Sequence, residues 1–153
     1  MEIKSAAFKN NEFIPAKYTC QGQDISPDLI FSDIPKEAKS LVLICDDPDA
    51  PMGTWDHWVV FNMPAATSLL PENIGGLQTF AYSSFRYGKN SSGENGYGGP
   101  CPPPGKAHRY FFKLYALDVP ELKLKDNARK KDVEEATKGH ILAQAQLIGL
   151  YKR

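Results

Sequence analysis

Short apolar runs separated by glycine and proline predict a chain built mainly of β-strands. The strongest run, S-L-V-L-I-C at residues 40–45, is apolar at nearly every position, which is typical of a central strand buried on both faces. Alternating patterns predict strands at residues 57–63 and 108–116. The pattern at residues 141–151 favours a closing strand, with a helix as the alternative. Weaker patterns indicate short strands at residues 2–8, at 29–32 and within 78–87.

Helical character is confined to one convincing segment, at residues 127–138. Val133 and Ala136 are its apolar positions among charged neighbours, and Gly139 stands where a helix would end. The 12 glycines and 12 prolines argue against a helical bundle. A chain of 153 residues without repeats or linkers is one domain of ordinary size, so we predict a single mainly β domain over residues 1–153.

The period of two along each strand assigns side chains to faces. Asp47 continues one face of the buried strand and emerges at its end. His57 opens the next strand on the face opposite to Trp58, together with Val59, Phe61 and Met63. His108 and Tyr110 share a face of the strand that starts at residue 108. Polar groups are therefore expected at the rim of a sheet, where pockets form.

Charge and hydropathy exclude several classes of protein. Eighteen basic residues balance eighteen acidic ones, so the chain lacks the broad positive field of a nucleic-acid or anionic-membrane surface. No apolar run approaches the length that spans a bilayer, and the start lacks the apolar core of a signal peptide. We expect a cytoplasmic protein that holds any anion in a local site.

The three cysteines are too few and too scattered for a disulfide framework. No C-x-x-C pair is present, which argues against a structural zinc site. Cys45 ends an apolar run and is most simply a core residue. Cys20 and Cys101 lie in loops rich in glycine and proline, and the sequence leaves open whether they pair.

The candidate chemistry lies in Asp47, Asp49, His57, His108 and Tyr110, at or near the ends of predicted strands. A histidine beside carboxylates tends to stay protonated, because negative charge favours its charged form. Two such histidines and a tyrosine hydroxyl would make a compact set of donors for phosphate or carboxylate.

A long connection at residues 88–105 precedes the second histidine. Loops of this length in a compact domain are usually functional or disordered, and its dense prolines favour function. Its Gly98-Gly99-Pro100 segment could bring backbone N–H groups close to a ligand.

Each candidate also has a simpler structural interpretation. His57 could be a core histidine with satisfied hydrogen bonds, and Asp47 and Asp49 could form a turn with local backbone. A metal site is a further alternative, but no H-x-H or H-x-x-x-H pair supports it. The chain has no G-x-S-x-G segment, so a serine hydrolase has little support.

Several motifs together give a specific resemblance. D-D-P-D-A-P at 46–51, W-D-H-W at 55–58 and G-G-P-C-P-P-P-G-K-A-H-R-Y at 98–110 resemble the phosphatidylethanolamine-binding protein family. Residues 18–29 and 139–147 are also similar to its short bacterial and archaeal branch, often labelled Raf kinase inhibitor-like. The resemblance implies an antiparallel β-sandwich, with a large central sheet packed on a smaller one and a few peripheral helices. It also implies a small pocket for phosphate-like or carboxylate anions.

The resemblance also implies which residues form that pocket. They would be Asp47, Asp49, His57, Gly99, His108 and Tyr110, with Pro51 and Trp55 shaping the pocket. No metal ion or other cofactor is expected. Family members have a cis peptide in the acidic turn, which makes Ala50–Pro51 the candidate here. Two departures are that Phe31 stands where relatives often have tryptophan, and that the connection at residues 52–55 is shorter than in eukaryotic members.

We therefore expect a non-enzymatic protein that binds a small anionic ligand or a phosphorylated group, with Asp47 and Asp49 orienting and charging the histidines. The alternative is a protein-interaction module that inhibits or regulates a protease or kinase through the loop at residues 88–106. A hydrolase that uses the same histidines and aspartates ranks third. The kinase-regulating functions of eukaryotic members do not transfer, no nucleic-acid partner or integral membrane association is expected, and a homodimer is left open.

Overall fold

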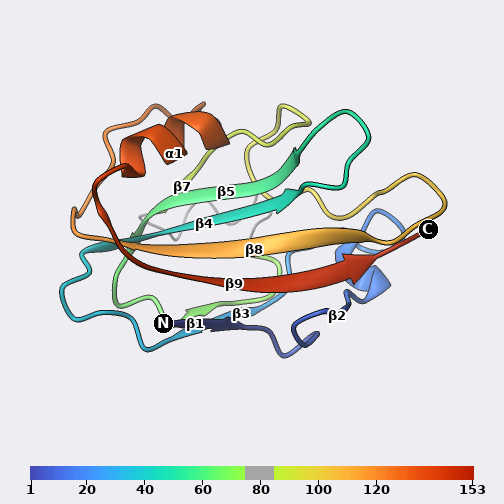
Figure 1. Cartoon of the computed structure of the whole chain (residues 1–153), viewed down its shortest axis with the longest axis horizontal. Coiled ribbons are helices and arrows are strands. Elements are labelled where there is room, and N and C mark those ends of the chain that lie inside the picture. Colours follow the sequence, from blue (N-terminus) through green and yellow to red (C-terminus); the bar gives the residue numbers. More distant parts are fainter. Residues whose placement is uncertain (75–84) are drawn as a thin grey trace.

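Two β-sheets packed face to face form the body of the protein (Figure 1). The computed structural model describes residues 1–74 and 85–153. The elements are β1 (Glu2–Lys4), β2 (Glu12–Phe13), a 3-10 turn η1 (Ala16–Tyr18), β3 (Leu29–Ser32), β4 (Ser40–Asp47), β5 (Trp55–Pro64), β6 (Leu69–Leu70), β7 (Arg86–Tyr87), β8 (His108–Leu117), α1 (Lys130–Thr137) and β9 (Ile141–Tyr151). The large sheet has the order β2-β9-β8-β4-β5-β7 and the small sheet the order β1-β3-β6. All pairings are antiparallel except that of β2 with β9.

The predicted fold class is confirmed: the chain is mainly β, with two sheets. The segment at residues 141–151 is a strand and not a helix, because it pairs along its length with β8. The central strand is longer than its apolar run and extends to Asp47. Fewer helices form than expected, since α1 and the short η1 are the helical elements of the described ranges. Most of the strand expected within residues 78–87 lies outside the described residues, apart from β7.

The core lies on both faces of β4, which is buried throughout. Leu41, Leu43 and Cys45 belong to the cluster between the two sheets. Val42 and Ile44 belong to a second cluster on the other face, together with Val133 of α1. Burial on both faces explains why residues 40–45 show no polar alternation.

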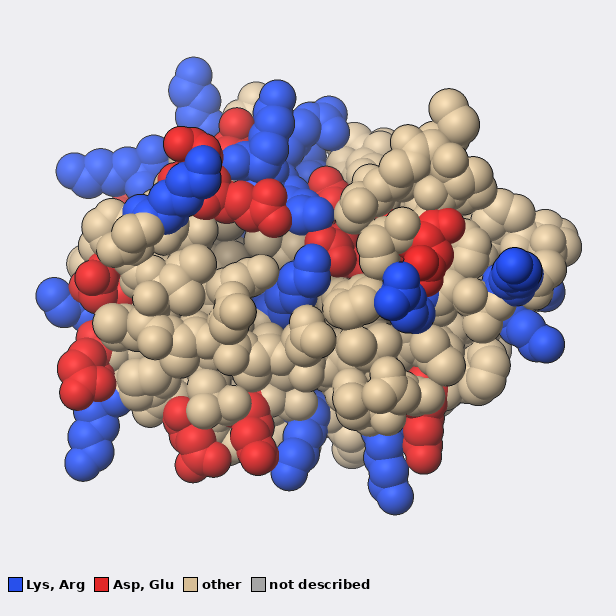
Figure 2. All heavy atoms as spheres, viewed as in Figure 1, with Lys and Arg blue, Asp and Glu red and all other residues tan. Residues whose placement is uncertain are grey.

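Helix α1 covers one half of the large sheet and is fixed there by charge as well as by apolar contact. The Lys130 Nζ lies 2.6 Å from the Asp46 Oδ2, and the Lys113 Nζ lies 2.9 Å from the same oxygen. Asp46 is 1% exposed, so this carboxylate is a buried anchor between sheet and helix. Figure 2 shows basic and acidic side chains interleaved over α1, while the face over β8 and β9 is mostly uncharged. No helix in the described part is long and apolar enough to cross a bilayer.

Two bulges, one near Asn62 and one at His57, change which way the side chains of β5 point. The bulge near Asn62 lies opposite the β4 residues Leu41 and Leu43. Leu41 pairs with Met63 but Leu43 pairs with Val60, so β5 has one extra residue there. Asn62 takes a left-handed conformation, with φ of 59°, at this point. Met63 consequently lies in the cluster between the sheets, and the prediction that it shares a face with Phe61 is wrong.

Candidate functional site

A pocket opens at the end of the large sheet where the chain's C-terminus lies (Figure 1). Antiparallel pairing brings the end of β4 beside the starts of β5 and β8, so residues from three strands meet there. The pocket has a volume of about 250 Å³. Its walls are formed by Asp47, Ala50, Pro51, Trp55, Asp56, His57, Asn90, Ser92, Gly98, Gly99, Cys101, Pro102, Pro103, His108 and Tyr110. Asp49 is the one expected site residue that does not line it.

Asp47 and His108 form the first polar pair of the pocket. The His108 Nδ1 lies 2.7 Å from the Asp47 Oδ2, and both side chains are largely buried. The other Asp47 oxygen accepts the backbone N–H of Asp49 at 2.8 Å. Both carboxylate oxygens are therefore occupied by donors, and the role of Asp47 is to hold the His108 ring in place. The expectation that Asp47 orients a histidine agrees with this geometry.

His57 is held by backbone and not by a carboxylate. Its Nδ1 lies 2.6 Å from the carbonyl oxygen of Gly98, and the Gly98 N–H donates to the His57 carbonyl at 2.9 Å. Burial lowers the pKa of His57 below its usual value of 6.5, although the Gly98 carbonyl and the nearby Asp47 oppose this shift. The ring is therefore neutral near neutral pH, which corrects the expectation that carboxylates keep it charged.

A bulge places His57 in the pocket. Cys45 pairs with Trp58 while Asp46 pairs with Asp56, so His57 is an extra residue opposite a single step of β4. The period of two predicted His57 on the face opposite to Trp58, and that prediction is wrong. Its ring makes an edge contact with the ring of Tyr110, a core residue of the Trp58 side, at 5.1 Å between centroids. Bulges commonly redirect a side chain in this way next to functional sites.

Tyr110 presents a buried hydroxyl at the base of the pocket. The Oη has no hydrogen-bond partner among the residues that the structure describes, although the residue is 1% exposed. Burial, with a further contribution from Asp47, raises the pKa of Tyr110 well above its usual value. The phenol is therefore a neutral donor at every ordinary pH. A buried hydroxyl in a pocket wall is a group that a ligand can satisfy.

Asp49 points away from the pocket and binds Arg109. Its carboxylate accepts hydrogen bonds from the Arg109 backbone N–H, the Nε and an Nη, each at 2.9 Å. The expectation that Asp49 orients a histidine is therefore wrong. Hydrogen bonds from Arg109 lower the pKa of Asp49 to about 2. The pair fixes the start of β8 to the turn after β4 from the outside.

We expect Arg109→Ala to raise the pKa of Asp49 from about 2 towards its usual value of 3.8. Because the folded pKa is lowered, the stability that this pair contributes is present above the unfolded pKa and is lost as the pH falls through the folded one. An NMR titration of the Asp49 carboxyl carbon measures the shift. Arg153→Ala is the control, because Arg153 donates to the Pro102 carbonyl and makes no hydrogen bond to Asp49. An unchanged pKa in R109A would contradict this assignment.

Gly99 is a glycine because the chain passes too closely for a side chain. A Cβ there would lie 2.3 Å from the Asp24 Oδ1 and 2.4 Å from the Tyr18 carbonyl oxygen. The Gly99 N–H donates to the Asp24 Oδ1 at 2.8 Å. The Gly98 N–H is also occupied, as described above. The expectation that these two amides would donate to a ligand is therefore wrong, and they build the wall instead.

Pro51 and Trp55 lie at the mouth of the pocket, as expected. The Gly53 N–H donates to the Ala50 carbonyl at 3.2 Å and closes a turn with Pro51 at its second position. A trans proline suits that position, whereas a cis proline belongs at the third position of a different turn type. No cis peptide occurs in residues 1–74 or 85–153, so the expectation of a cis Ala50–Pro51 bond is wrong.

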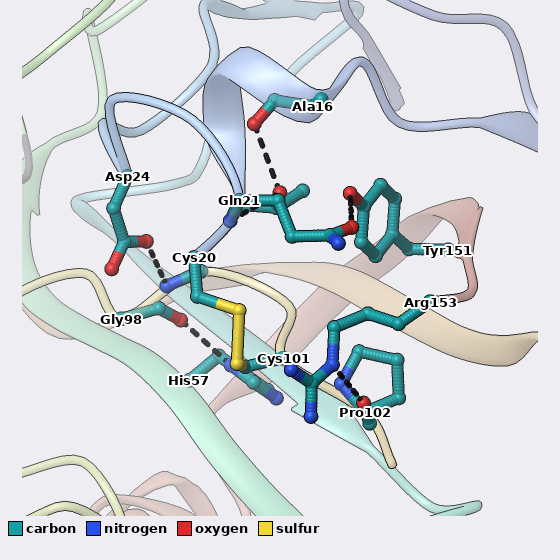
Figure 3. The surroundings of a disulfide bond; sticks show 12 residues. Ala16, Cys20, Gln21, Asp24, His57, Gly98, Cys101, Pro102, Tyr151 and Arg153 are labelled. Atoms are coloured by element: carbon teal, nitrogen blue, oxygen red, sulfur yellow. Dashed lines mark hydrogen bonds between the residues drawn. A yellow bond between two sulfur atoms is a disulfide. The ribbon is translucent and has the colours of Figure 1, made fainter. Parts of the chain in front are cut away.

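A disulfide forms part of the pocket wall and answers the question that the sequence left open. Cys20 and Cys101 are bonded, with their Cα atoms 5.4 Å apart. Figure 3 shows the bond beside His57, with Asp24 on one side, where its carboxylate accepts the Gly99 N–H. On the other side the Tyr151 hydroxyl donates to Gln21, and the Arg153 Nε donates to the Pro102 carbonyl at 2.6 Å. The disulfide and three hydrogen bonds thus join the loop after η1, the loop before β8 and the chain's end to one another.

Several of these groups could not be recognised in the sequence. The Asp24 carboxylate and the Gly98 carbonyl each contact a residue far away along the chain. The strand pattern assigns Arg109 only to the face opposite to His108, with no sign of its contact with Asp49. Asn90 had a weak signal, since asparagine before serine and glycine favours a turn; its Oδ1 accepts the N–H groups of Ser92 and Glu94 at 3.0 and 3.1 Å. Across the described ranges, no three His, Cys, Asp or Glu side chains gather so as to hold a metal ion.

Comparisons with known proteins agree with the architecture. The sequence profile of the phosphatidylethanolamine-binding protein family matches residues 4–152. A UPF0098 protein of Methanothermobacter thermautotrophicus is 52% identical, over 100% of this chain and 99% of its own length. A UPF0098 protein of Aquifex aeolicus is 53% identical, over 100% of this chain and 89% of its own.

Two solved structures share the fold over nearly the whole chain. A Chlamydia trachomatis protein described as a homologue of phosphatidylethanolamine-binding protein has a TM-score of 0.89 at 45% identity, covering 99% of this chain and 97% of its own. Escherichia coli YbcL, described as a member of the mammalian family, has a TM-score of 0.93 at 31% identity, covering 99% of this chain and 98% of its own. The motifs, the two sheets and these matches lead to one conclusion: the chain belongs to the phosphatidylethanolamine-binding protein family.

Proposed function

We propose that this protein is a non-enzymatic binder of a small oxyanion, a phosphate-like or carboxylate group, in the pocket at the end of β4, β5 and β8. The observation that carries the proposal is a set of three polar atoms in the pocket walls. The Nε2 of His57, the Nε2 of His108 and the Oη of Tyr110 have no protein partner within the described residues. An oxyanion can satisfy several such groups at once.

The electrostatics suit an anion of low charge. Asp47 is compensated by His108 at 2.7 Å, and Asp56 lies 3.4 Å from the Lys130 Nζ. The Asp47 carboxylate accepts from the His108 Nδ1, and a ring that carries both protons also donates from Nε2. The His108 Nε2 and the Tyr110 hydroxyl are therefore the donors that face an incoming anion. Names of relatives that refer to phosphatidylethanolamine are consistent with a phosphate-like ligand.

Catalysis has little support in the same walls. Cys101 is bonded to Cys20 and cannot act as a thiolate nucleophile. Both oxygens of Asp47 already accept hydrogen bonds, and the Ser92 hydroxyl in the wall has no hydrogen bond to a histidine or carboxylate of the described residues that could act as its base. Turnover of generic ester or phosphoester substrates by the wild type, lost in His57→Ala, would instead favour the hydrolase.

A protein-interaction role is the second candidate, because apolar side chains are exposed at the pocket mouth. Met52, in the turn that follows β4, is 97% exposed, and Trp55, the first residue of β5, is 42% exposed. Loss of partner capture in a Met52→Ser, Trp55→Ser variant that still binds phosphate would favour this role. The cytoplasmic location and the absence of a nucleic-acid partner stay predictions. The disulfide bears on the first of these, since cytosolic thiols are usually kept reduced.

We expect His108→Ala to weaken phosphate binding by about 1.5–3 kcal/mol, which is about 10- to 150-fold in Kd, because it removes a donor to a charged ligand. Isothermal titration with inorganic phosphate measures this loss. His140→Ala is the matched control, since His140 also pairs with an aspartate, Asp118 at 2.8 Å, but precedes β9 at its other end. Equal binding by H108A and the wild type would overturn the proposed pocket.

A further inference from the structure

The tautomer of His57 is determined by its backbone partner. A carbonyl oxygen can only accept a hydrogen bond, so the Nδ1 that lies 2.6 Å from the Gly98 oxygen must carry a proton. In a neutral imidazole the other nitrogen then carries a lone pair. In the neutral ring, the Nε2 of His57 is therefore an acceptor in the pocket wall.

The surroundings of His57 do not change this assignment. Asp47 on β4 is bound to His108, and Asp46 is bound to Lys113 and Lys130 on the far face of the sheet. Asp56 on β5 lies near Lys130, and Tyr110 on β8 meets the ring by its edge. No carboxylate is in hydrogen-bond contact with the ring among the described residues. Burial also lowers the pKa of His57, so the neutral form predominates near neutral pH.

Of the three unpartnered atoms, at most two are donors, the Nε2 of His108 and the Oη of Tyr110, and at least one is an acceptor, the Nε2 of His57. We propose that it selects oxyanions that carry a proton, such as hydrogen phosphate or the monoanion of a phosphate monoester, over oxyanions that carry none. This inference rests on the proposed function and names the class of ligand for the same site. The P–O–H group donates to His57, while other oxygens accept from His108 and Tyr110.

The selection has a direct physical cause. A sulfate ion has no proton near neutral pH, so one of its oxygens would face the lone pair of His57 with nothing between them. A binding site with an acceptor that a ligand leaves unpaired discriminates strongly against that ligand. A phosphodiester, as in an intact phospholipid, also has no P–O–H group. The geometry therefore favours free phosphate or a monoester as the source of the phosphate group.

The first test compares inorganic phosphate and sulfate by isothermal titration at about pH 7.5, where hydrogen phosphate keeps a proton. We expect the wild type to prefer phosphate by about tenfold or more. His57→Ala should reduce this ratio towards one, because it removes the acceptor. Tyr110→Phe is the matched control: it removes a donor, so it should weaken both anions and leave the ratio unchanged. A disulfide assay and a thermal melt of each variant establish that it is folded.

The second test uses the proton of the ligand itself. The second pKa of a phosphate monoester is about 6, so methyl phosphate loses its last proton above that pH, whereas inorganic phosphate keeps one. The affinity for methyl phosphate relative to phosphate should fall about tenfold for each pH unit above neutrality. Any change of the protein with pH affects both ligands, so the ratio of affinities isolates the ligand's proton. The ¹⁵N chemical shift of the His57 Nε2 should also be that of an unprotonated nitrogen.

The outcomes separate the inference from the proposed function. Equal affinity of the wild type for phosphate and sulfate, or a constant ratio of methyl phosphate to phosphate across this pH range, would overturn the inference while the anion pocket stands. Binding of none of these anions would overturn both. A protonated Nε2 in the ¹⁵N spectrum of the free protein would also overturn the inference.

Discussion

Replacing both Cys20 and Cys101 with alanine is expected to lower the free energy of unfolding by about 4.5 kcal/mol. The disulfide joins residues separated by 81 positions. Closing a loop of that length removes much conformational freedom from the unfolded chain, and the chain-entropy relation gives about 4.5 kcal/mol. Urea denaturation of the oxidised wild type and of the double variant measures the difference.

Reduction of the wild type is the matched control for this substitution. In the presence of reductant the wild type should match the double variant, and the variant itself should be insensitive to reductant. Cys45 does not complicate the comparison, because it is buried and burial raises the pKa of its thiol. A loss of less than about 2 kcal/mol would contradict the expectation and would mean that the three hydrogen bonds around the disulfide already restrain these loops.

The second large effect is expected on the opposite face of the sheet. Asp46→Ala should lower the free energy of unfolding by about 3 kcal/mol, because it leaves two lysines without their shared buried partner. Lys130 and Lys113 approach one oxygen of Asp46 at 2.6 and 2.9 Å. Their side chains are 16% and 29% exposed, so they can turn partly towards water, and the loss lies at the lower end for a broken buried pair. Urea denaturation near neutral pH measures the loss.

The pH dependence of this loss provides a further check. Burial is the largest single influence and lowers the pKa of Lys130, but the hydrogen bond to Asp46 and the charges of Asp46, Asp56 and Glu134 together raise the pKa above its usual value. A raised lysine pKa gives stability that is present below the unfolded pKa and is lost as the pH rises through the folded one. The difference between the wild type and D46A should therefore shrink in strong alkali. Asp56→Ala is the control with a smaller effect, since Asp56 lies 3.4 Å from Lys130 and is more exposed.

Local sequence patterns could predict the strands that carry the site. The uninterrupted run at residues 40–45 identified β4 because a strand buried on both faces has no polar side. The alternation at residues 108–116 gave the register that places His108 and Tyr110 together, since β8 has no irregularity before Ala116. The position of Asp47, at the end of β4 and on one known face of the strand, also followed from the period of two alone.

Features that depend on contacts between distant segments could not be predicted. The bulge at His57 arises from pairing with β4, so the period of two assigned this residue to the wrong face. Asp49 meets Arg109 across 60 positions, and Gly99 meets Asp24 across 75. The pairing of Cys20 with Cys101 likewise depends on how two loops approach. Motif resemblance compensated for the bulge, because it names residues without requiring their register.

The extra residue at His57 in β5 constrains the length of the chain as well as its composition. Deleting one residue between Trp55 and Trp58 would restore a regular pairing with β4 and leave no redirected side chain at the position of His57. An inserted residue would shift the register of the strand's start in the opposite sense. Among relatives that keep this pocket, insertions and deletions should therefore be excluded from W-D-H-W, even where its individual side chains vary.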